Sequence, residues 1–144
     1  MTIVHKSVLL NYSAEQMYAL VDDMESYPFF LPWCDRVEIQ RDPDGQTVIA
    51  SIFLNFCGIT QSFTTCNTHT EPSSIRMKLI RGPFRRLDGQ WTFSALDGNR
   101  CRVELYLNYE FSHFFLEKLL GPVFDMVTNS LVDSFCERAR KIHG

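Results

Sequence analysis

Five short turn sequences constrain most strongly what this chain can fold into. They divide the chain after Trp33 into six runs, each of which alternates apolar and polar residues as a β-strand does. The turns are Asp42-Pro43-Asp44-Gly45, Cys57-Gly58, Glu71-Pro72-Ser73, Gly82-Pro83 and Asp97-Gly98-Asn99. Such short connections join antiparallel neighbours, because a parallel crossover needs roughly a dozen residues or more. The sequence therefore predicts six consecutive antiparallel strands, and the run from Ile3 to Leu10 adds a seventh.

The alternation gives the predicted sheet one apolar face and one polar face. In the last run Leu105 and Leu107 share one side, whereas Arg102 and Glu104 share the other. The apolar face also receives Val48, Ala50, Ile52, Leu54, Phe56, Ile59, Phe63, Ile75, Met77, Leu79, Leu87, Trp91, Phe93, Val103, Tyr109 and Phe111. A sheet of this kind needs a second layer, because its apolar face must be covered.

The end of the chain has the pattern of a helix that can provide this layer. After Gly121-Pro122, apolar residues recur at three- to seven-residue intervals, and Pro122 suits the first turn of a helix. The Gly-Pro pair is expected to separate this helix from a short apolar segment, residues 114 to 120. The helix has the apolar residues Phe124, Val127, Leu131, Phe135 and Ile142. We expect it to lie across a strongly curved antiparallel sheet.

Two short helices are predicted between the first and second strands. Ser13 and Gln16 form a capping box at the start of the first helix. The stretch SYPFFLPWC, residues 26 to 34, contains four aromatic residues and two prolines, too broken for a strand. Pro28 suits the first turn of the second helix, and Pro32 is expected to end it. We expect this stretch to cap one end of the core and to form the rim of any cavity there.

Length and composition set the remaining limits. A chain of 144 residues is expected to form a single domain, residues 1–144. The N-terminus lacks the features of a signal peptide, and no apolar run is long enough to span a bilayer, so a cytoplasmic protein is expected. The five cysteines include no C-x-x-C pair, so the sequence suggests neither a disulfide framework nor a metal site. The twelve phenylalanines indicate a wide apolar interior.

The predicted order of elements resembles an α+β helix-grip fold, the START-like or SRPBCC fold of lipid-transfer domains and the polyketide cyclase superfamily. Within that superfamily the sequence resembles the ribosome association toxins of bacteria and their relatives, the mitochondrial coenzyme Q-binding proteins. The matching segments are Tyr12-Ser13-Ala14-Glu15-Gln16-Met17-Tyr18, Ser26-Tyr27-Pro28, Phe30-Leu31-Pro32 with Cys34, and Gly82-Pro83-Phe84 with Leu87, Gly89, Trp91 and Phe93. The resemblance extends over nearly the whole chain.

This resemblance implies a cavity between the sheet and the C-terminal helix that binds a lipophilic molecule, ubiquinone being the expected ligand. The predicted ligand-binding residues are Tyr27, Phe30, Trp33, Phe63, Thr65, Met77, Leu79, Trp91, Phe93, Leu105, Leu107, Val127 and Leu131. Gln61 and Asn67 share the phase of Phe63 and can also offer hydrogen bonds. The alternative is that these large side chains meet and fill the core, because periodicity determines which way a residue faces and not how much volume is left.

The expected function is therefore that of a quinone chaperone or carrier that supports respiration. No covalent cofactor is expected, and Phe114, Phe115 and Leu116 are candidates for transient contact with the inner membrane. A cyclase-type enzyme is a weaker alternative, because the inward positions supply few acids, bases or nucleophiles: Tyr109, Cys101 and His69 near a strand end. No catalytic residue is assigned.

The charge distribution offers a second candidate function. The net charge of −3 argues against DNA binding, but residues 76 to 102 contain seven bases and two acids. Arg81, Arg85 and Arg86 surround the Gly82-Pro83 turn and can pair with phosphates. Resemblance to the ribosome association toxins implies binding to the large ribosomal subunit, which blocks subunit joining. The alternative is that these bases merely cover the wet face of the strands.

Overall fold

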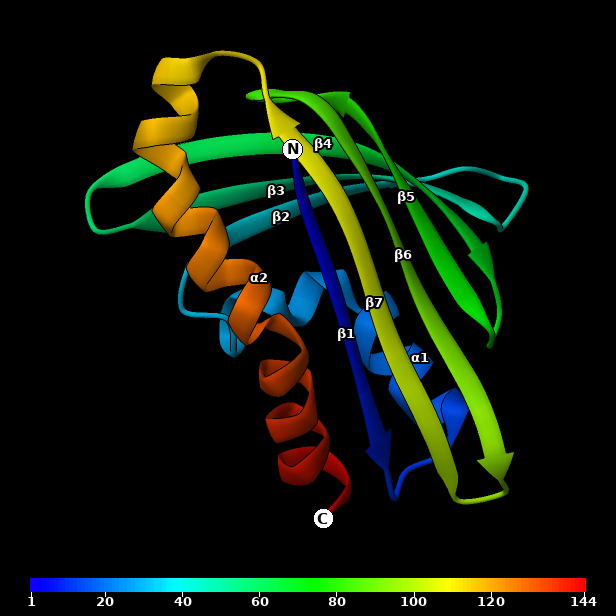
Figure 1. The fold of residues 1–144 in the computed structure, drawn as a ribbon. Helices are drawn as coiled ribbons and strands as arrows, with labels where there is room; N and C mark the ends of the chain where they lie inside the picture. The colour runs from blue at the N-terminus through cyan, green and yellow to red at the C-terminus, as the bar shows by residue number, and fades with distance from the viewer.

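The computed structural model describes residues 1–144 and consists of one curved sheet, two short helices and one long helix (Figure 1). Its strands are β1 (Thr2–Leu10), β2 (Cys34–Arg41), β3 (Thr47–Phe56), β4 (Ile59–Thr70), β5 (Ser74–Arg81), β6 (Phe84–Asp97) and β7 (Arg100–Phe111). The helices are α1 (Ala14–Asp22), the 3-10 helix η1 (Met24–Phe29) and α2 (Phe114–His143). The predicted seven-stranded antiparallel sheet and the helix-grip fold are confirmed.

The sheet has the order β1-β7-β6-β5-β4-β3-β2, and every neighbouring pair is antiparallel. Strands β2 to β7 follow one another as a meander, whereas β1 pairs with β7 at the far edge. The register shifts at four places in three strand pairs, including one between Thr64 and Thr65 of β4. Such bulges bend a strand and increase its twist. The sheet therefore curves into a trough, as β3 and β4 show in Figure 1.

Helix α2 crosses the concave side of this trough (Figure 1). It is one helix of 30 residues, so the predicted break at Gly121-Pro122 is wrong. Proline removes one helical hydrogen bond and crowds the preceding turn. Leu120, Val123 and Phe124 are nevertheless all buried, so contacts on both sides of Pro122 hold the two parts of the helix against the sheet. None of the helices has the length and apolar character needed to cross a membrane.

The two short helices lie between β1 and β2. The Ser13 hydroxyl accepts from the amide of Gln16 at 3.1 Å, and the Gln16 side chain accepts from the amide of Ser13 at 2.9 Å, so the capping box is confirmed. Helix η1 ends before Pro32 as predicted but begins at Met24, so Pro28 does not lie in its first turn. The amide of Ser26 bonds to the carbonyl of Asp23 at 3.1 Å, which starts the helical turn earlier.

The capping box gives a direct test of how α1 is held. We expect Ser13→Ala to lower the free energy of unfolding by about 1 kcal/mol, because the amide of Gln16 at the helix start loses its partner, the Ser13 hydroxyl. Urea denaturation followed by circular dichroism measures this loss. Ser7→Ala, at an exposed position of β1, is the matched control and should leave the midpoint unchanged. Equal stabilities for the two variants would contradict the role assigned to the cap.

Candidate ligand-binding cavity

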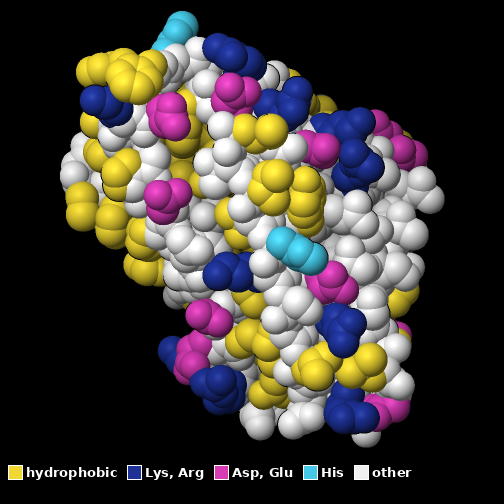
Figure 2. All heavy atoms as spheres, in the orientation of Figure 1, with side chains coloured by type: hydrophobic (Ala, Val, Ile, Leu, Met, Phe, Trp, Pro, Cys, Tyr) yellow, Lys and Arg dark blue, Asp and Glu magenta, His cyan; other side chains and the backbone are white.

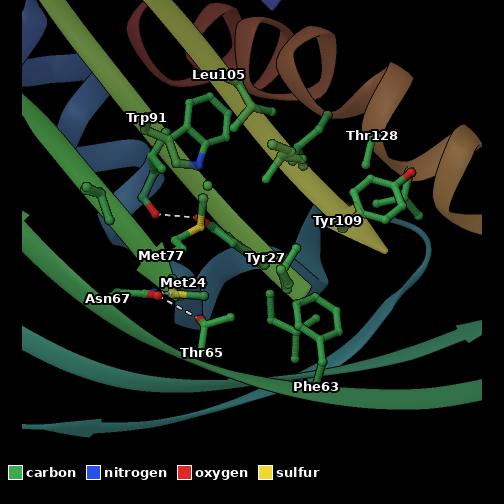
Figure 3. Close-up of a pocket in the computed structure, with 18 of the residues that line it drawn as sticks. Met24, Tyr27, Phe63, Thr65, Asn67, Met77, Trp91, Leu105, Tyr109 and Thr128 are labelled. Carbon is green, nitrogen blue, oxygen red and sulfur yellow. Dashed lines mark hydrogen bonds between the residues drawn. The ribbon is translucent and has the colours of Figure 1, made fainter. Parts of the chain in front are cut away.

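A mostly apolar cavity lies between the concave face of the sheet, η1 and α2 (Figure 3). Its volume is about 100 Å³. The residues that line it are Val21, Met24, Tyr27, Trp33, Ile52, Phe63, Thr65, Asn67, His69, Ile75, Met77, Leu87, Gly89, Trp91, Leu105, Leu107, Tyr109, Val127, Thr128, Leu131 and Phe135. Ligand pockets usually measure roughly 300 to 1,000 Å³, so this cavity is too small for a whole lipid.

Ten of the thirteen predicted ligand-binding residues line the cavity. They are Tyr27, Trp33, Phe63, Thr65, Met77, Trp91, Leu105, Leu107, Val127 and Leu131. Figure 3 shows that Phe63, Thr65 and Asn67 of β4, together with Met77, Trp91 and Leu105 of the next strands, surround the same space. The period-two alternation therefore brings residues of four neighbouring strands to one cavity wall.

Three predicted residues lie outside the cavity. Phe30 packs its ring 5.3 Å from that of Phe135, on the side of a surface groove. Leu79 lies beyond the segment of β5 that pairs with β6, which ends at Lys78. Phe93 is covered by α1, with its ring centroid 5.5 Å from that of Tyr18. Facing the core is therefore not enough to reach the cavity: other rings cover Phe30 and Phe93, and Leu79 lies past the end of the β5–β6 pairing.

Several wall residues are not among the predicted ligand-binding residues. Val21 belongs to the end of α1 and Met24 to the start of η1, and the position of these helices over the sheet has no local sequence signal. Ile52, Ile75, Leu87 and Tyr109 were placed on the correct face but were not chosen for the wall. On α2, Thr128 follows the predicted Val127, and Phe135 lies one turn after the predicted Leu131. Gly89 has no side chain that would suggest a role. Gln61 does not reach the cavity.

Aromatic rings fill the trough on both sides of the cavity. At one end Phe84, Phe111 and Phe124 pack with centroids 5.1 to 5.6 Å apart. Towards α1, the rings of Trp91 and Phe93 stack with centroids 6.3 Å apart. The sequence left two alternatives open, a ligand cavity and a filled core. The structure lies between them, because the rings fill most of the core and leave one small cavity.

Unpartnered polar atoms distinguish this cavity from an ordinary packing defect. Four buried side-chain polar atoms have no hydrogen-bond partner, and three of them belong to wall residues: Trp33 Nε1, His69 Nδ1 and Tyr109 Oη. Buried polar groups in proteins are nearly always hydrogen-bonded. Leaving one unpaired costs roughly 1 to 3 kcal/mol. Three residues of the wall thus carry a buried polar atom that has no hydrogen-bond partner within the protein.

Other polar wall residues bind one another or the backbone. The Thr65 hydroxyl donates to Asn67 Oδ1 at 2.7 Å, and Asn67 Nδ2 lies 3.6 Å from Met24 Sδ (Figure 3). Thr128 donates to the carbonyl of Phe124 at 2.8 Å. Tyr27 donates to the carbonyl of Val21. These bonds fix the positions of the polar groups in the wall.

Burial keeps the tyrosines of this region protonated. It raises the pKa of Tyr27 and that of Tyr109, because a phenolate is poorly solvated in an apolar interior. Burial also raises the pKa of Tyr18, beside the cavity, to about 12, with a further contribution from the nearby carboxylate of Asp22. The phenols are therefore neutral hydrogen-bonding groups at physiological pH.

The fold is the START-like helix-grip fold, and it encloses a mostly apolar cavity. Residues 10–136 match the model of the family described as "Polyketide cyclase / dehydrase and lipid transport". The chain belongs to this family. A START superfamily protein from Mycobacterium smegmatis superimposes with a TM-score of 0.77 at 21% identity, covering 97% of this chain and 98% of that chain, which shows the shared fold.

Two curated relatives confirm the narrower resemblance. The "Ribosome association toxin RatA" of Vibrio cholerae is 40% identical over 141 residues, which cover 98% of this chain and 97% of that protein. The mitochondrial "Coenzyme Q-binding protein COQ10 homolog B" of Xenopus laevis is 28% identical over 143 residues, which cover 96% of this chain and 58% of that protein. The chain is thus similar to proteins named for two different activities.

Gly89 allows the cavity to be tested without removing a wall residue. A Cβ atom at this position would lie 2.6 Å from Leu107 Cδ2 and 2.9 Å from Met77 Cε, which are flexible side-chain ends. We expect Gly89→Ala to push these ends into the cavity, abolish xenon binding and cost about 1 to 3 kcal/mol of stability. Methyl chemical shifts under xenon pressure measure the binding. Gly98→Ala, where nothing lies within 4 Å, should bind xenon as the unaltered protein does.

Proposed function

We propose that this protein binds a lipophilic molecule with an oxygen-bearing ring, and that ubiquinone is this ligand. The observation that carries the proposal is the set of three polar atoms without a hydrogen-bond partner on residues of a mostly apolar wall. Quinone oxygens accept hydrogen bonds from donors such as the Trp33 indole N–H and the Tyr109 hydroxyl. The flat ring of Trp91 and the flexible side chain of Met77 suit an aromatic group between them.

The size of the cavity suggests which part of such a ligand would lie inside the protein and which part on its surface. A dry cavity of roughly 150 Å³ holds benzene, so a cavity of about 100 Å³ would take the ring only after side chains move to enlarge it. A groove of about 420 Å³ between η1 and α2 lies outside the contact between Phe30 and Phe135. Phe135 lines the cavity and Phe30 the groove. An isoprenoid tail that leaves the cavity beside this pair would lie in the groove.

The biological role that follows is that of a quinone chaperone or carrier serving respiratory electron transport. The name of the Xenopus coenzyme Q-binding relative supports this role. We do not propose an enzyme, although the family description includes cyclases, because none of the wall residues is paired as a nucleophile with a base. No metal or covalent cofactor is needed for the proposed role.

The proposed location is the cytoplasm, with transient contact at the inner membrane. Phe114 and Phe115 at the start of α2 are 72% and 73% exposed, and Lys118 lies over the ring of Phe114. Figure 2 shows this cluster of hydrophobic side chains at the upper left, next to a dark blue one. Exposed aromatic residues beside a base are typical of a surface that touches anionic lipid.

The ligand is tested by extraction and by a variant that fills the cavity. We expect gently purified protein from a quinone-producing host to carry an isoprenoid quinone near one equivalent, detected by mass spectrometry. Leu107→Trp should remove most of it, because the larger ring occupies the space that the ligand requires. Tyr106→Trp, at the neighbouring outward position of β7, is the matched control and should retain it. Retention by a folded Leu107→Trp protein would contradict the proposed site.

A second candidate function is binding to the large ribosomal subunit, which the name of the Vibrio relative suggests. Arg81, Arg85 and Arg86 are all exposed around the β5–β6 turn. Arg85 is 66% exposed and only weakly paired with Glu110, at 3.5 Å. Figure 2 shows Lys and Arg side chains along the upper edge of the molecule, with acidic side chains between them. Arginines in such a turn can contact ribosomal RNA phosphates.

A double charge reversal tests this contact. We expect Arg85→Glu/Arg86→Glu to reduce cosedimentation with the large subunit at least about tenfold at low salt, because two phosphate contacts become repulsive. The matched control is Arg100→Glu/Arg102→Glu, which changes the charge equally at the opposite end of the β6–β7 hairpin. Cosedimentation that is identical for the two double variants would refute the assigned surface.

A further inference from the structure

His69 separates the internal cavity from the outside of the molecule. It lies near the end of β4, and its ring forms part of the cavity wall. The same residue lines a surface cleft of about 410 Å³, whose other residues include Asp22, Arg41 and Glu71. The side chain is only 9% exposed. One histidine therefore stands between a polar cleft and an apolar interior.

The orientation of the imidazole is fixed by Asp22. Nε2 of His69 lies 2.9 Å from Oδ1 of Asp22, and the ring of Tyr18 packs edge-on with a centroid distance of 6.2 Å. The hydrogen bond with His69 and the nearby Arg41 lower the pKa of Asp22, so its carboxylate is ionised. An ionised carboxylate only accepts hydrogen bonds, so Nε2 must carry a hydrogen atom.

The other ring nitrogen has no partner within the protein. Nδ1 of His69 is buried and makes no hydrogen bond. The two nitrogens of an imidazole point in widely different directions, so Nδ1 is turned away from Asp22, which lines the cleft but not the cavity. In a neutral histidine whose Nε2 holds the hydrogen atom, Nδ1 is an acceptor. An acceptor nitrogen can bind a ligand group that donates a hydrogen bond, such as a hydroxyl. A quinone carbonyl has no hydrogen atom to donate.

We propose that Nδ1 of His69 accepts a hydrogen bond from a ring hydroxyl of the bound ligand, so the cavity prefers a hydroquinone or other phenolic ring over a quinone. This inference rests on the proposed lipophilic-ligand function and adds the oxidation state of the ligand. Ile75 pairs with His69 across the strands, and Trp91 pairs with Ile75, so a flat wall begins next to the acceptor. The ring would lie against this wall with its hydroxyl at His69.

The closing experiment compares two probes that differ only in oxidation state. The probes are 2,3-dimethoxy-5-methyl-1,4-hydroquinone and the corresponding quinone, titrated anaerobically by calorimetry at about pH 8. We expect about five- to tenfold tighter binding of the hydroquinone, the gain of one buried hydrogen bond. His69→Phe should remove this preference and still bind the quinone. His5→Phe is the matched control, because His5 pairs with Glu104 on the exposed face.

The outcomes separate this inference from the proposed function. Equal affinity of the unaltered protein for both probes, or a preference that survives His69→Phe, would overturn the acceptor role and leave the lipid-binding function in place. Binding of neither probe would refute both. If His69→Phe does not fold, the ¹⁵N resonance of Nδ1 in the unaltered protein decides the question. It should move on addition of the hydroquinone and stay in place with the quinone; a resonance that the hydroquinone leaves unmoved refutes the proposal.

Discussion

The contact between α2 and the concave face of the sheet supports every other feature of this protein. A curved sheet with one apolar face is not stable until that face is covered, and α2 is the only element long enough to follow the trough. Two ring contacts tie the layers together, Phe84 with Phe124 at 5.1 Å and Trp91 with Phe135 at 5.3 Å. Edge-to-face pairs contribute about 0.5 to 1.5 kcal/mol beyond the area they bury. The cavity lies between these two contacts, so they determine its length.

The cavity reflects a compromise between packing and binding. Phenylalanine rings close both ends, which limits the free volume, but the wall retains polar atoms without partners at Trp33, His69 and Tyr109. A core selected only for stability would replace such groups with apolar ones, since each unpaired group costs roughly 1 to 3 kcal/mol. Their presence around one cavity is the physical reason to connect this interior with an oxygen-bearing ligand.

The two proposed activities use different parts of the molecule. The lipophilic ligand would be held inside, whereas the arginines of the β5–β6 turn lie outside, near the start of α2 (Figure 1). The two regions touch at Phe63, which lines the cavity and lies against Gly82 of the turn. Gly82 has a φ of 152°, and a Cβ atom there would lie 2.7 Å from Phe63 Cβ, so only glycine fits. Because the cavity is internal and the arginines of the turn lie on the surface, a ligand in the cavity does not occupy the surface that would contact the ribosome.

The sequence by itself determined the strands, the consecutive order of β2 to β7 and the facing of their residues, because turn residues and period-two alternation are local properties. It placed Met77, Trp91 and Leu107 on the cavity face, and the capping box located the start of α1. Which inward side chains reach free space was decided only by the tertiary structure, which places α1 over Phe93 and leaves Tyr109 at the cavity.

Only the tertiary structure shows that α2 continues without a break at Gly121-Pro122 and that Asp22 lies next to His69. The physical reason is that cavity volume and contacts between distant segments depend on the curvature of the sheet, which no single segment encodes.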